Sequence, residues 1–333
     1  MYNEIQSLVL NLNIEIIIKE IIKIKQKNPS TFLGKGNLLR LKDKIIKYKI
    51  NLLIINNNLS PSQQRNLEKL LNIKVTDRSG IIIEIFSKRA STKESRLQVE
   101  LAELIYRKSR LVRAWTHLER QRGGTTFIGG PGELQIELDK RLIQSKIVRI
   151  KKRLVKVKAR RKIQRKSRLN SNFQTFALVG YTNAGKTKLF NKLTKKKQSS
   201  QNKLFETLDT KISKFYLNDH QVGIIDTVGF INNIPTQLIE SFHATLEEIN
   251  SANFIINVVD VNDINAHDKI LTTKRILKET GVSEDKISKM INVYNKIDLS
   301  NSNYKQTQNR IFISALTGEG IENLKKSIER KLT

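Results

Sequence analysis

Apolar and polar residues follow patterns along the chain that change character twice. In the first part, up to about residue 91, short apolar runs typical of strands alternate with stretches at helical spacing. The clearest are the strand runs Leu52–Asn56 and Ile73–Thr76 and the helical stretches Gly36–Lys47 and Pro61–Leu71. Ser60 just before Pro61 is a good helix cap, because proline suits the first helical turn. The pattern predicts a small α/β domain with a mainly parallel sheet over residues 1–91.

The middle part, residues 92–171, has two apolar stripes at alternating four- and three-residue spacing. The first stripe is Leu97, Leu101, Leu104, Leu111, Trp115 and Leu118; the second is Ile143, Ile147, Ile150, Leu154 and Val157. Two such stripes in series predict antiparallel helices packed along an apolar seam. The glycine-rich loop Gly123–Gly132 lies between them and could be a plain connector. It is longer and richer in glycine than a helix turn requires, and basic residues flank it, so we favour a protruding tip that contacts RNA.

The last part, residues 172–333, has the pattern of a doubly wound α/β domain. Buried strands are expected at Thr175–Val179, Val222–Asp226, Phe254–Val259, Ile291–Asn295 and Ile311–Ser314. Helical stretches separate these runs, and a final helix begins at Ile321. A mainly parallel sheet of this kind binds its ligands at the carboxyl ends of its strands.

A phosphate-binding motif stands at the first of these strand ends. It reads Gly180-Tyr181-Thr182-Asn183-Ala184-Gly185-Lys186-Thr187 and matches G-x-x-x-x-G-K-[ST] between a strand and a helix. The glycines let successive N–H groups point at phosphate oxygens, and the helix N-terminus adds positive potential. Lys186 should reach the β- and γ-phosphates, and the Thr187 hydroxyl should bind Mg²⁺. This motif alone would also fit an ATPase.

Two further motifs supply the parts of a nucleotide switch. Asp226-Thr227-Val228-Gly229 follows the next strand, and Phe205-Glu206-Thr207-Leu208-Asp209 lies between the two motifs. Asp226 would hold Mg²⁺ through water, and the Gly229 N–H would contact the γ-phosphate. A threonine in a loop is usually structural, but the position of Thr207 makes it the best second hydroxyl ligand for Mg²⁺. We expect Lys186, Thr207 and Gly229 to act in hydrolysis itself.

The last two strand ends carry residues suited to a guanine base. They are Asn295-Lys296-Ile297-Asp298 and Ser314-Ala315-Leu316. The Asp298 carboxylate can accept the two N–H groups of the guanine edge, a donor pair that adenine lacks. Asn295 can tie its loop to the phosphate loop, and the Ala315 N–H can reach the guanine oxygen. The motifs in this order, each at a strand end, predict GTP as the substrate.

Phe230 follows Gly229, where small GTPases such as Ras carry a glutamine that positions water. A phenylalanine cannot orient water by hydrogen bonding, so we expect slow hydrolysis by the isolated chain and stimulation by a partner. In some GTPases an asparagine at the place of Asn183 helps to bind K⁺, which can replace an arginine finger. Dependence on K⁺ is therefore a hypothesis.

The composition indicates a negatively charged partner and excludes several classes of chemistry. The formal net charge is +30, and the chain has no cysteine, which excludes disulfides, thiolate catalysis and cysteine-bound zinc. The four histidines are scattered, and no apolar run approaches the roughly 20 residues that span a bilayer. The N-terminus has no signal-peptide pattern. We expect a soluble, cytoplasmic protein that is a monomer when free and binds no membrane.

The positive charge is concentrated in the second helix of the hairpin. Fifteen basic residues and no acidic one lie between Lys140 and Arg168. A biased genome would explain abundant lysine, isoleucine and asparagine, but neither the many arginines here nor the missing glutamate. A nucleic-acid partner is favoured over a solvated charged face, and a membrane surface is a weaker third reading.

Several of these motifs together resemble the HflX-type GTPases. The resemblance rests on the phosphate loop with Leu189-Phe190-Asn191, on Asp226–Phe230, and on Trp115-Thr116-His117-Leu118-Glu119-Arg120-Gln121. It is also carried by Leu59-Ser60-Pro61, Gln64-Arg65-Asn66-Leu67-Glu68, Asp77-Arg78 and Gly130-Pro131-Gly132-Glu133. It extends from about residue 31 to the end of the GTPase domain. Thr187 replaces the more usual serine, and Lys188 stands where the family often has threonine.

The resemblance implies a GTPase that binds the large ribosomal subunit and its ribosomal RNA and splits stalled or idle ribosomes, with hydrolysis resetting the switch. By the same resemblance the first domain and the hairpin dock on ribosomal RNA. ATP hydrolysis in addition to GTP hydrolysis occurs in the family. Little follows the last helix, so we expect the additional C-terminal domain of some members to be absent. The alternative is an RNA-binding assembly or hibernation factor in which the GTP state only sets affinity.

Overall fold

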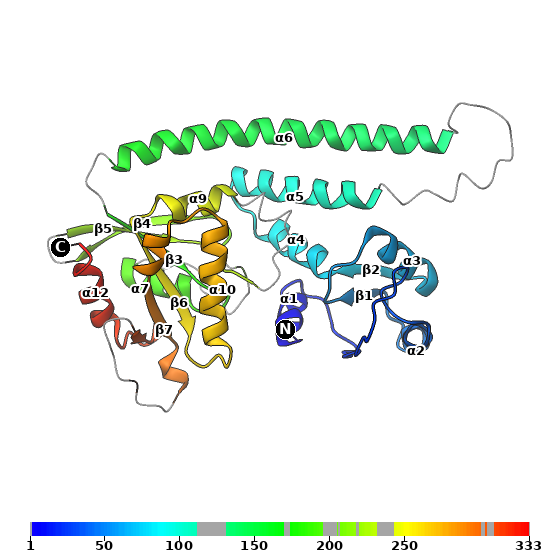
Figure 1. Cartoon of the computed structure of the whole chain (residues 1–333), viewed down its shortest axis with the longest axis horizontal. Helices are drawn as coiled ribbons and strands as arrows, with labels where there is room; N and C mark the ends of the chain where they lie inside the picture. Colours follow the sequence, from blue (N-terminus) through cyan, green and yellow to red (C-terminus); the bar gives the residue numbers. More distant parts are fainter. Residues whose placement is uncertain are drawn as a thin grey trace. The chain divides into compact units, whose positions relative to one another are not determined.

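The computed structural model describes residues 2–111, 131–169, 174–195, 205, 207–217, 220–231, 243–300, 304 and 310–332. The chain forms two compact units (Figure 1). The first unit includes Met1–Lys88 and Leu97–Val155, and the second includes Arg89–Arg96, Lys156–Ile234 and Ile239–Thr333. Each unit has its own core.

The first unit begins with alternating helices and strands, as predicted. In order they are α1 (Tyr2–Leu10), α2 (Lys35–Lys47), β1 (Leu52–Ile55), α3 (Pro61–Leu71), β2 (Lys74–Asp77) and α4 (Arg78–Arg89). Strands β1 and β2 pair in parallel, with Leu52 opposite Lys74. A capping box starts α3: the Gln63 N–H donates to the Ser60 hydroxyl at 3.1 Å, and the Ser60 N–H donates to the Gln63 side chain at 3.0 Å. Two orphan donors of the first turn are thereby satisfied.

A helical hairpin follows, made of α5 (Lys93–Leu111) and α6 (Pro131–Leu169). Its seam is the predicted one, because Leu97 and Leu101 of α5 cluster with Ile147, Ile150 and Leu154 of α6. Leu104 packs against the same cluster, whereas Trp115 and Leu118 lie outside the described residues. The predicted loop Gly123–Gly132 is outside them up to residue 130, but Pro131 and Gly132 belong to α6 and not to the loop. On α6 the basic side chains between the seam positions are exposed, namely Lys146, Arg149, Lys151, Lys152 and Arg153.

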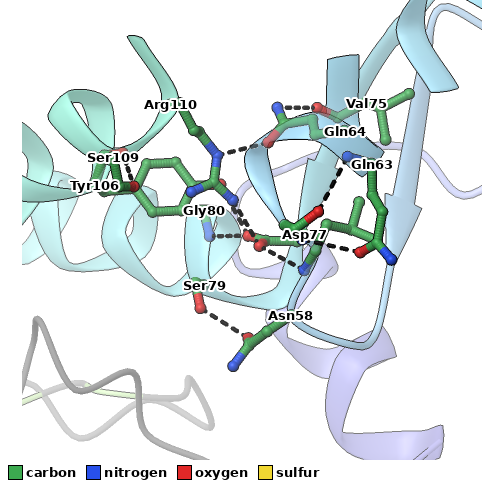
Figure 2. A network of polar contacts seen from close by, with 12 residues as sticks. Asn58, Gln63, Gln64, Val75, Asp77, Ser79, Gly80, Tyr106, Ser109 and Arg110 are labelled. Carbon is green, nitrogen blue, oxygen red and sulfur yellow. Dashed lines mark hydrogen bonds and ion pairs between the residues drawn. The ribbon is translucent and has the colours of Figure 1, made fainter. Parts of the chain in front are cut away.

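A buried polar network holds helix α5 to the sheet of the first unit (Figure 2). Asp77, at the end of β2, is 1% exposed and accepts four hydrogen bonds. They come from the N–H groups of Leu59 at 3.2 Å and Gly80 at 2.8 Å, the Tyr106 hydroxyl at 2.8 Å and the Arg110 guanidinium at 2.7 Å. The Arg110 guanidinium also lies over the Tyr106 ring, 3.5 Å from its centroid. Every lone pair of the buried carboxylate is therefore well supplied with donors.

The second unit contains a six-stranded sheet in the order β4-β5-β3-β6-β7-β8. The strands are β3 (Thr175–Val179), β4 (Lys211–Leu217), β5 (His220–Asp226), β6 (Phe254–Asp260), β7 (Ile291–Asn295) and β8 (Arg310–Ile313). All neighbouring pairs are parallel except β4 with β5. The antiparallel edge strand β4 was not among the predicted strands, because its apolar residues alternate with polar ones instead of forming a buried run.

Helices cover both faces of this sheet. Helices α7 (Lys186–Thr194) and α12 (Ile321–Glu329) share one apolar core with the strands. Helices α9 (His243–Ser251), α10 (Ala266–Glu279) and α11 (Glu284–Ser288) pack on the other face. The short 3-10 helix η2 (Ile297–Leu299) follows β7. The predicted doubly wound α/β fold is therefore confirmed, and it gathers the loops after β3, β5, β7 and β8 at one edge. Among the described residues, no helix is long and apolar enough to cross a membrane.

Candidate functional site

The phosphate-loop motif forms a tight turn between β3 and α7. Gly180 has φ +136°, and a Cβ there would lie 2.2 Å from the Val258 carbonyl oxygen. Gly185 has φ +95° and directly precedes α7; a Cβ there would lie 2.1 Å from the Asn295 amide nitrogen. Only glycine fits both places, because of the positive φ and the close contacts. The loop brings the free N–H groups of the helix start to one edge of a cavity.

Lys186 is the buried cation of this loop. Its side chain is 6% exposed, and its ammonium group donates to the carbonyl oxygens of Gly180 at 3.1 Å and Tyr181 at 2.8 Å. Burial lowers the pKa of Lys186 from 10.5 to about 8, although the charge of Asp226 opposes the shift. The two hydrogen-bond acceptors of the ammonium group are neutral carbonyls, so a phosphate group beside it would add a directly bonded anionic partner.

Three side chains from separate motifs meet beside the loop. The Thr207 hydroxyl lies 2.7 Å from the Thr187 hydroxyl, and both donate to Asp226 Oδ2, at 2.8 Å and 3.0 Å. Asp226 is fully buried, and its Oδ1 has no hydrogen-bond partner among the described residues. Burial raises the pKa of Asp226, against the effect of the two hydroxyls and Lys186. Two hydroxyls and an under-satisfied carboxylate are hard oxygen donors, so the residues present fit Mg²⁺.

The segment around Thr207 is buried on both sides of that residue. Phe205 and Leu208 are each 3% exposed, and Glu206 lies outside the described residues. We expected Asp209 to bind nucleotide, but its carboxylate accepts hydrogen bonds from Ser91 and Thr92. Burial raises the pKa of Asp209, but the hydrogen bonds from Ser91, Thr92 and Ser95 outweigh it, so the pKa is lowered.

Gly229 and Phe230 close the site from the side of β5. A Cβ at Gly229 would lie 2.8 Å from the Thr182 Cα and 2.9 Å from the Lys186 ammonium nitrogen. The Phe230 N–H donates to the Gly180 carbonyl at 3.0 Å, and the Thr182 N–H donates to the Phe230 carbonyl at 2.8 Å. The Phe230 ring is buried in the apolar core and does not line the cavity. The residue directly after Gly229, where Ras-like proteins have their glutamine, is therefore one whose side chain cannot form a hydrogen bond.

The residues predicted to bind the base are joined by Asn295, which is 2% exposed. Its amide donates to the Ala184 carbonyl at 2.8 Å, and its oxygen accepts from the Ala315 N–H at 2.9 Å. The Ser314 hydroxyl donates to Asp298 at 2.5 Å, which orients the carboxylate. Lys296 pairs with Asp260 at 2.7 Å. These contacts fix the loop after β7 against the phosphate loop and the loop after β8.

A cavity of about 400 Å³ lies among these loops. It is lined by Thr182, Asn183, Gly185, Lys186, Thr187, Lys188, Phe205, Thr207, Thr227, Gly229, Asn295, Lys296, Asp298, Leu299, Ala315 and Leu316. Two of these, Lys188 and Leu299, were not predicted as site residues, although each directly follows a motif. The predicted residues that do not line it are Gly180, Tyr181, Ala184, Leu208, Asp209, Asp226, Val228, Ile297 and Ser314. Most of these lie behind the lining as backbone or supporting groups.

A doubly wound sheet with a phosphate loop, a buried hydroxyl–carboxylate cluster and an Asn-Lys-x-Asp loop at one edge defines a P-loop GTPase. Three protein-family models match the chain. "GTP-binding GTPase N-terminal" matches residues 1–87, "GTP-binding GTPase Middle Region" matches 89–168, and "50S ribosome-binding GTPase" matches 175–296.

Curated relatives and a solved structure agree with these matches. A protein named GTPase HflX from Magnetococcus marinus is 43% identical, over 98% of this chain and 77% of the relative. GTPase HflX from Escherichia coli is 37% identical, over 99% of this chain and 78% of the relative. The crystal structure of a GTP-binding protein from Sulfolobus solfataricus in complex with GDP is also similar, with 25% sequence identity and a TM-score of 0.51. The match covers 99% of this chain and 94% of the other. The chain belongs to the HflX family of GTPases.

Proposed function

We propose that the chain hydrolyses GTP in the cavity between the phosphate loop and the loops after β5, β7 and β8, with Mg²⁺ as cofactor. The buried cluster of Thr187, Thr207 and Asp226 carries this proposal, because its carboxylate keeps an unpartnered oxygen. Bound Mg²⁺ would neutralise charge on the phosphates. Thr187 and Thr207 would be its direct ligands, and Asp226 would act through water.

Each remaining part of the cavity would hold one part of GTP. Lys186 would exchange its two backbone carbonyl partners for the β- and γ-phosphates. The Gly229 N–H would contact the γ-phosphate, and the Asp298 carboxylate, oriented by Ser314, would accept the guanine N–H groups. The Phe230 ring cannot orient water, so hydrolysis by the isolated chain should be slow and a partner should accelerate it.

The proposed partner is the large ribosomal subunit with its RNA, which would place the protein in the cytoplasm. The exposed basic face of α6 supports a polyanionic partner, and the family model of the GTPase domain is named for ribosome binding. In the proposed cycle the GTP-bound form separates stalled or idle ribosomes into subunits, and hydrolysis resets it for release. Binding would then do the work of splitting.

A sucrose-gradient profile of intact ribosomes tests the cycle. Ribosomes are incubated with the chain and GTP, GDP or a slowly hydrolysed GTP analogue. We expect free subunits with GTP and with the analogue, and intact ribosomes with GDP. Splitting with GTP but not with the analogue would mean that hydrolysis drives separation. Co-sedimentation with large subunits but no splitting in any state would favour an assembly or hibernation factor.

The basic face of α6 can be tested by charge reversal. Arg149→Glu with Lys152→Glu should weaken co-sedimentation with large subunits and flatten its dependence on salt, because fewer counterions are released. The matched control is Lys274→Glu with Arg275→Glu, which reverses two exposed charges on α10. Equal binding by both variants over a salt series would contradict a role for this face.

We propose that GTP hydrolysis depends on K⁺ because of Asn183. This residue lines the cavity, and its backbone has a φ of +63°. A cation held there would supply positive charge beside the phosphates in place of an arginine finger. We expect faster GTP hydrolysis in K⁺ buffer than in Na⁺ buffer of equal ionic strength, and no difference for Asn183→Ala. Equal rates of the unsubstituted chain in both buffers would exclude the idea.

A further inference from the structure

The link between helices α4 and α5 belongs to the nucleotide-binding unit. The stretch Arg89–Arg96 packs with that unit, whereas the chain on both sides of it belongs to the first unit. We call this stretch the connector. It contains the cap and the first turn of α5, so whatever holds the connector also holds the start of the hairpin.

Asp209 holds the connector through four hydrogen bonds. Its carboxylate accepts the hydroxyls of Ser91 and Thr92, each at 2.5 Å, and the backbone N–H groups of the same two residues at 3.3 Å and 3.2 Å. Four donors on one carboxylate form a specific, charge-assisted contact. Thr92 in turn caps α5, because its hydroxyl accepts the Ser95 N–H at 3.1 Å. Asp209 therefore binds the capping residue of the helix itself.

The other end of the same short segment reaches the nucleotide site. Only Leu208, itself buried, separates Asp209 from Thr207. Consecutive Cα atoms are about 3.8 Å apart, so the Cα atoms of Thr207 and Asp209 are at most about 7 Å apart, and a large displacement of one residue is passed to the other. The Thr207 hydroxyl forms hydrogen bonds with the Thr187 hydroxyl and the Asp226 carboxylate. The segment is thus held at the metal-binding cluster and at the connector at once.

We propose that Asp209 is a positioning residue that links Thr207 to the start of helix α5, so that nucleotide at the site controls how firmly the connector is held. The proposal rests on the proposed function, since it needs Thr207 to bind the metal of the GTP state. GTP would fix Thr207 and thereby Asp209 against Ser91 and Thr92. GDP lacks the γ-phosphate that keeps such a loop in place, so the contact would loosen.

Amide hydrogen exchange in the full chain tests the link. Exchange of peptides covering residues 89–96 is compared with GDP and with a slowly hydrolysed GTP analogue, both with Mg²⁺. We expect exchange at least about fivefold slower with the analogue, given the strength of charge-assisted hydrogen bonds. In Asp209→Ala the two nucleotides should give the same exchange. A carboxylate that merely caps the helix would protect the connector equally in both states, and that result would overturn the proposal.

Nucleotide affinity provides a second readout. Asp209→Ala should weaken binding of the GTP analogue about tenfold, because Thr207 loses its support, and leave GDP affinity unchanged. Ser91→Ala removes one donor from the connector side and should act in the same direction with a smaller effect. The double variant should be no worse than Asp209→Ala. Asp285→Ala, which removes an exposed carboxylate paired with Lys289 on α11, is the control and should change neither affinity.

Equal loss of GDP and analogue affinity in Asp209→Ala, or additive effects of the two substitutions, would overturn the link while leaving the GTPase proposal intact. If the unsubstituted chain bound neither nucleotide, the proposed function itself would fail.

Discussion

Two buried aspartates, one in each unit, end a strand of a parallel sheet and yet are used in opposite ways. Asp77 is the last residue of β2 and has donors on both carboxylate oxygens: Gly80 and Tyr106 on one, Leu59 and Arg110 on the other. Asp226 ends β5 and has donors on Oδ2 only. A buried carboxylate with hydrogen bonds to both oxygens stabilises the fold. One with a free oxygen is left able to bind a further partner.

The difference follows from what surrounds each carboxylate. Asp77 has a guanidinium that pairs with it at 2.7 Å, so its charge is neutralised inside the protein. Asp226 accepts hydrogen bonds from two neutral hydroxyls, and burial raises its pKa against the effect of these hydroxyls and of the charges of Lys186 and Lys211. In the first unit the Asp77 network fixes helix α5 to the sheet. In the second unit, the further partner of the Asp226 carboxylate would be the cation bound at the site.

Asp226→Asn should have the largest effect, on catalysis. We expect Mg²⁺-dependent GTP hydrolysis to fall roughly a thousandfold, because the charge that attracts the cation is removed. Stability of the metal-free chain should be equal or higher, since the buried side chain no longer has to carry a charge. Single-turnover rates and thermal unfolding in a chelating buffer measure the two effects. Loss of stability with little loss of rate would reverse the assignment of the two aspartates.

Asp77→Asn should show the opposite profile. Removing one partner of a buried ion pair costs about 3–5 kcal/mol, so the first unit should unfold at lower urea. GTP hydrolysis by the isolated chain should change little. Glu103→Gln, which breaks the exposed pair of Glu103 with Arg107, is the control and should cost no more than about 0.5 kcal/mol. Equal costs for both substitutions would mean that the Asp77 network adds nothing beyond a surface pair.

Lys186→Met should change the pH dependence of stability in nucleotide-free, metal-free protein. The pKa of Lys186 is about 8 when folded and 10.5 when unfolded, so the unfolded chain binds more protons between those values. Stability of the unsubstituted chain, relative to Lys186→Met, should therefore rise from pH 8 to 10.5, by on the order of 2–3 kcal/mol. Urea unfolding of both proteins over this range measures the difference. A flat or falling difference would contradict the burial penalty.

Tyr106→Phe should have the smallest effect. It removes one of the four donors to Asp77 and keeps the ring under the Arg110 guanidinium, so we expect a loss of about 1 kcal/mol. Urea unfolding beside Asp77→Asn gives the comparison. A loss as large as that of Asp77→Asn would mean that the hydroxyl, and not the ion pair, dominates the network.

Much of the architecture was readable from local patterns. Apolar periodicity indicated β1, β2, α3, the hairpin and most strands of the large sheet, because burial on one or both faces imposes a period that neighbouring residues display. The phosphate-loop and Asn-Lys-x-Asp motifs were readable because their chemistry needs fixed residue types at fixed spacing. Strand β4 was not predicted, because it lies at the edge of the sheet and its apolar residues alternate with polar ones instead of forming a continuous buried run.

The sequence by itself determined which residues stand at the strand ends and therefore which chemistry the nucleotide site can perform. Only the tertiary structure decided which of two buried aspartates is satisfied, because the donors to Asp77 come from up to 33 positions away. It likewise decided that Asp209 binds Ser91 and Thr92, more than a hundred positions earlier, instead of lining the cavity. The spacing of apolar residues along a chain reflects whether the segment is a helix or a strand. Which distant side chains meet depends on how the helices and strands pack, and no local pattern contains that information.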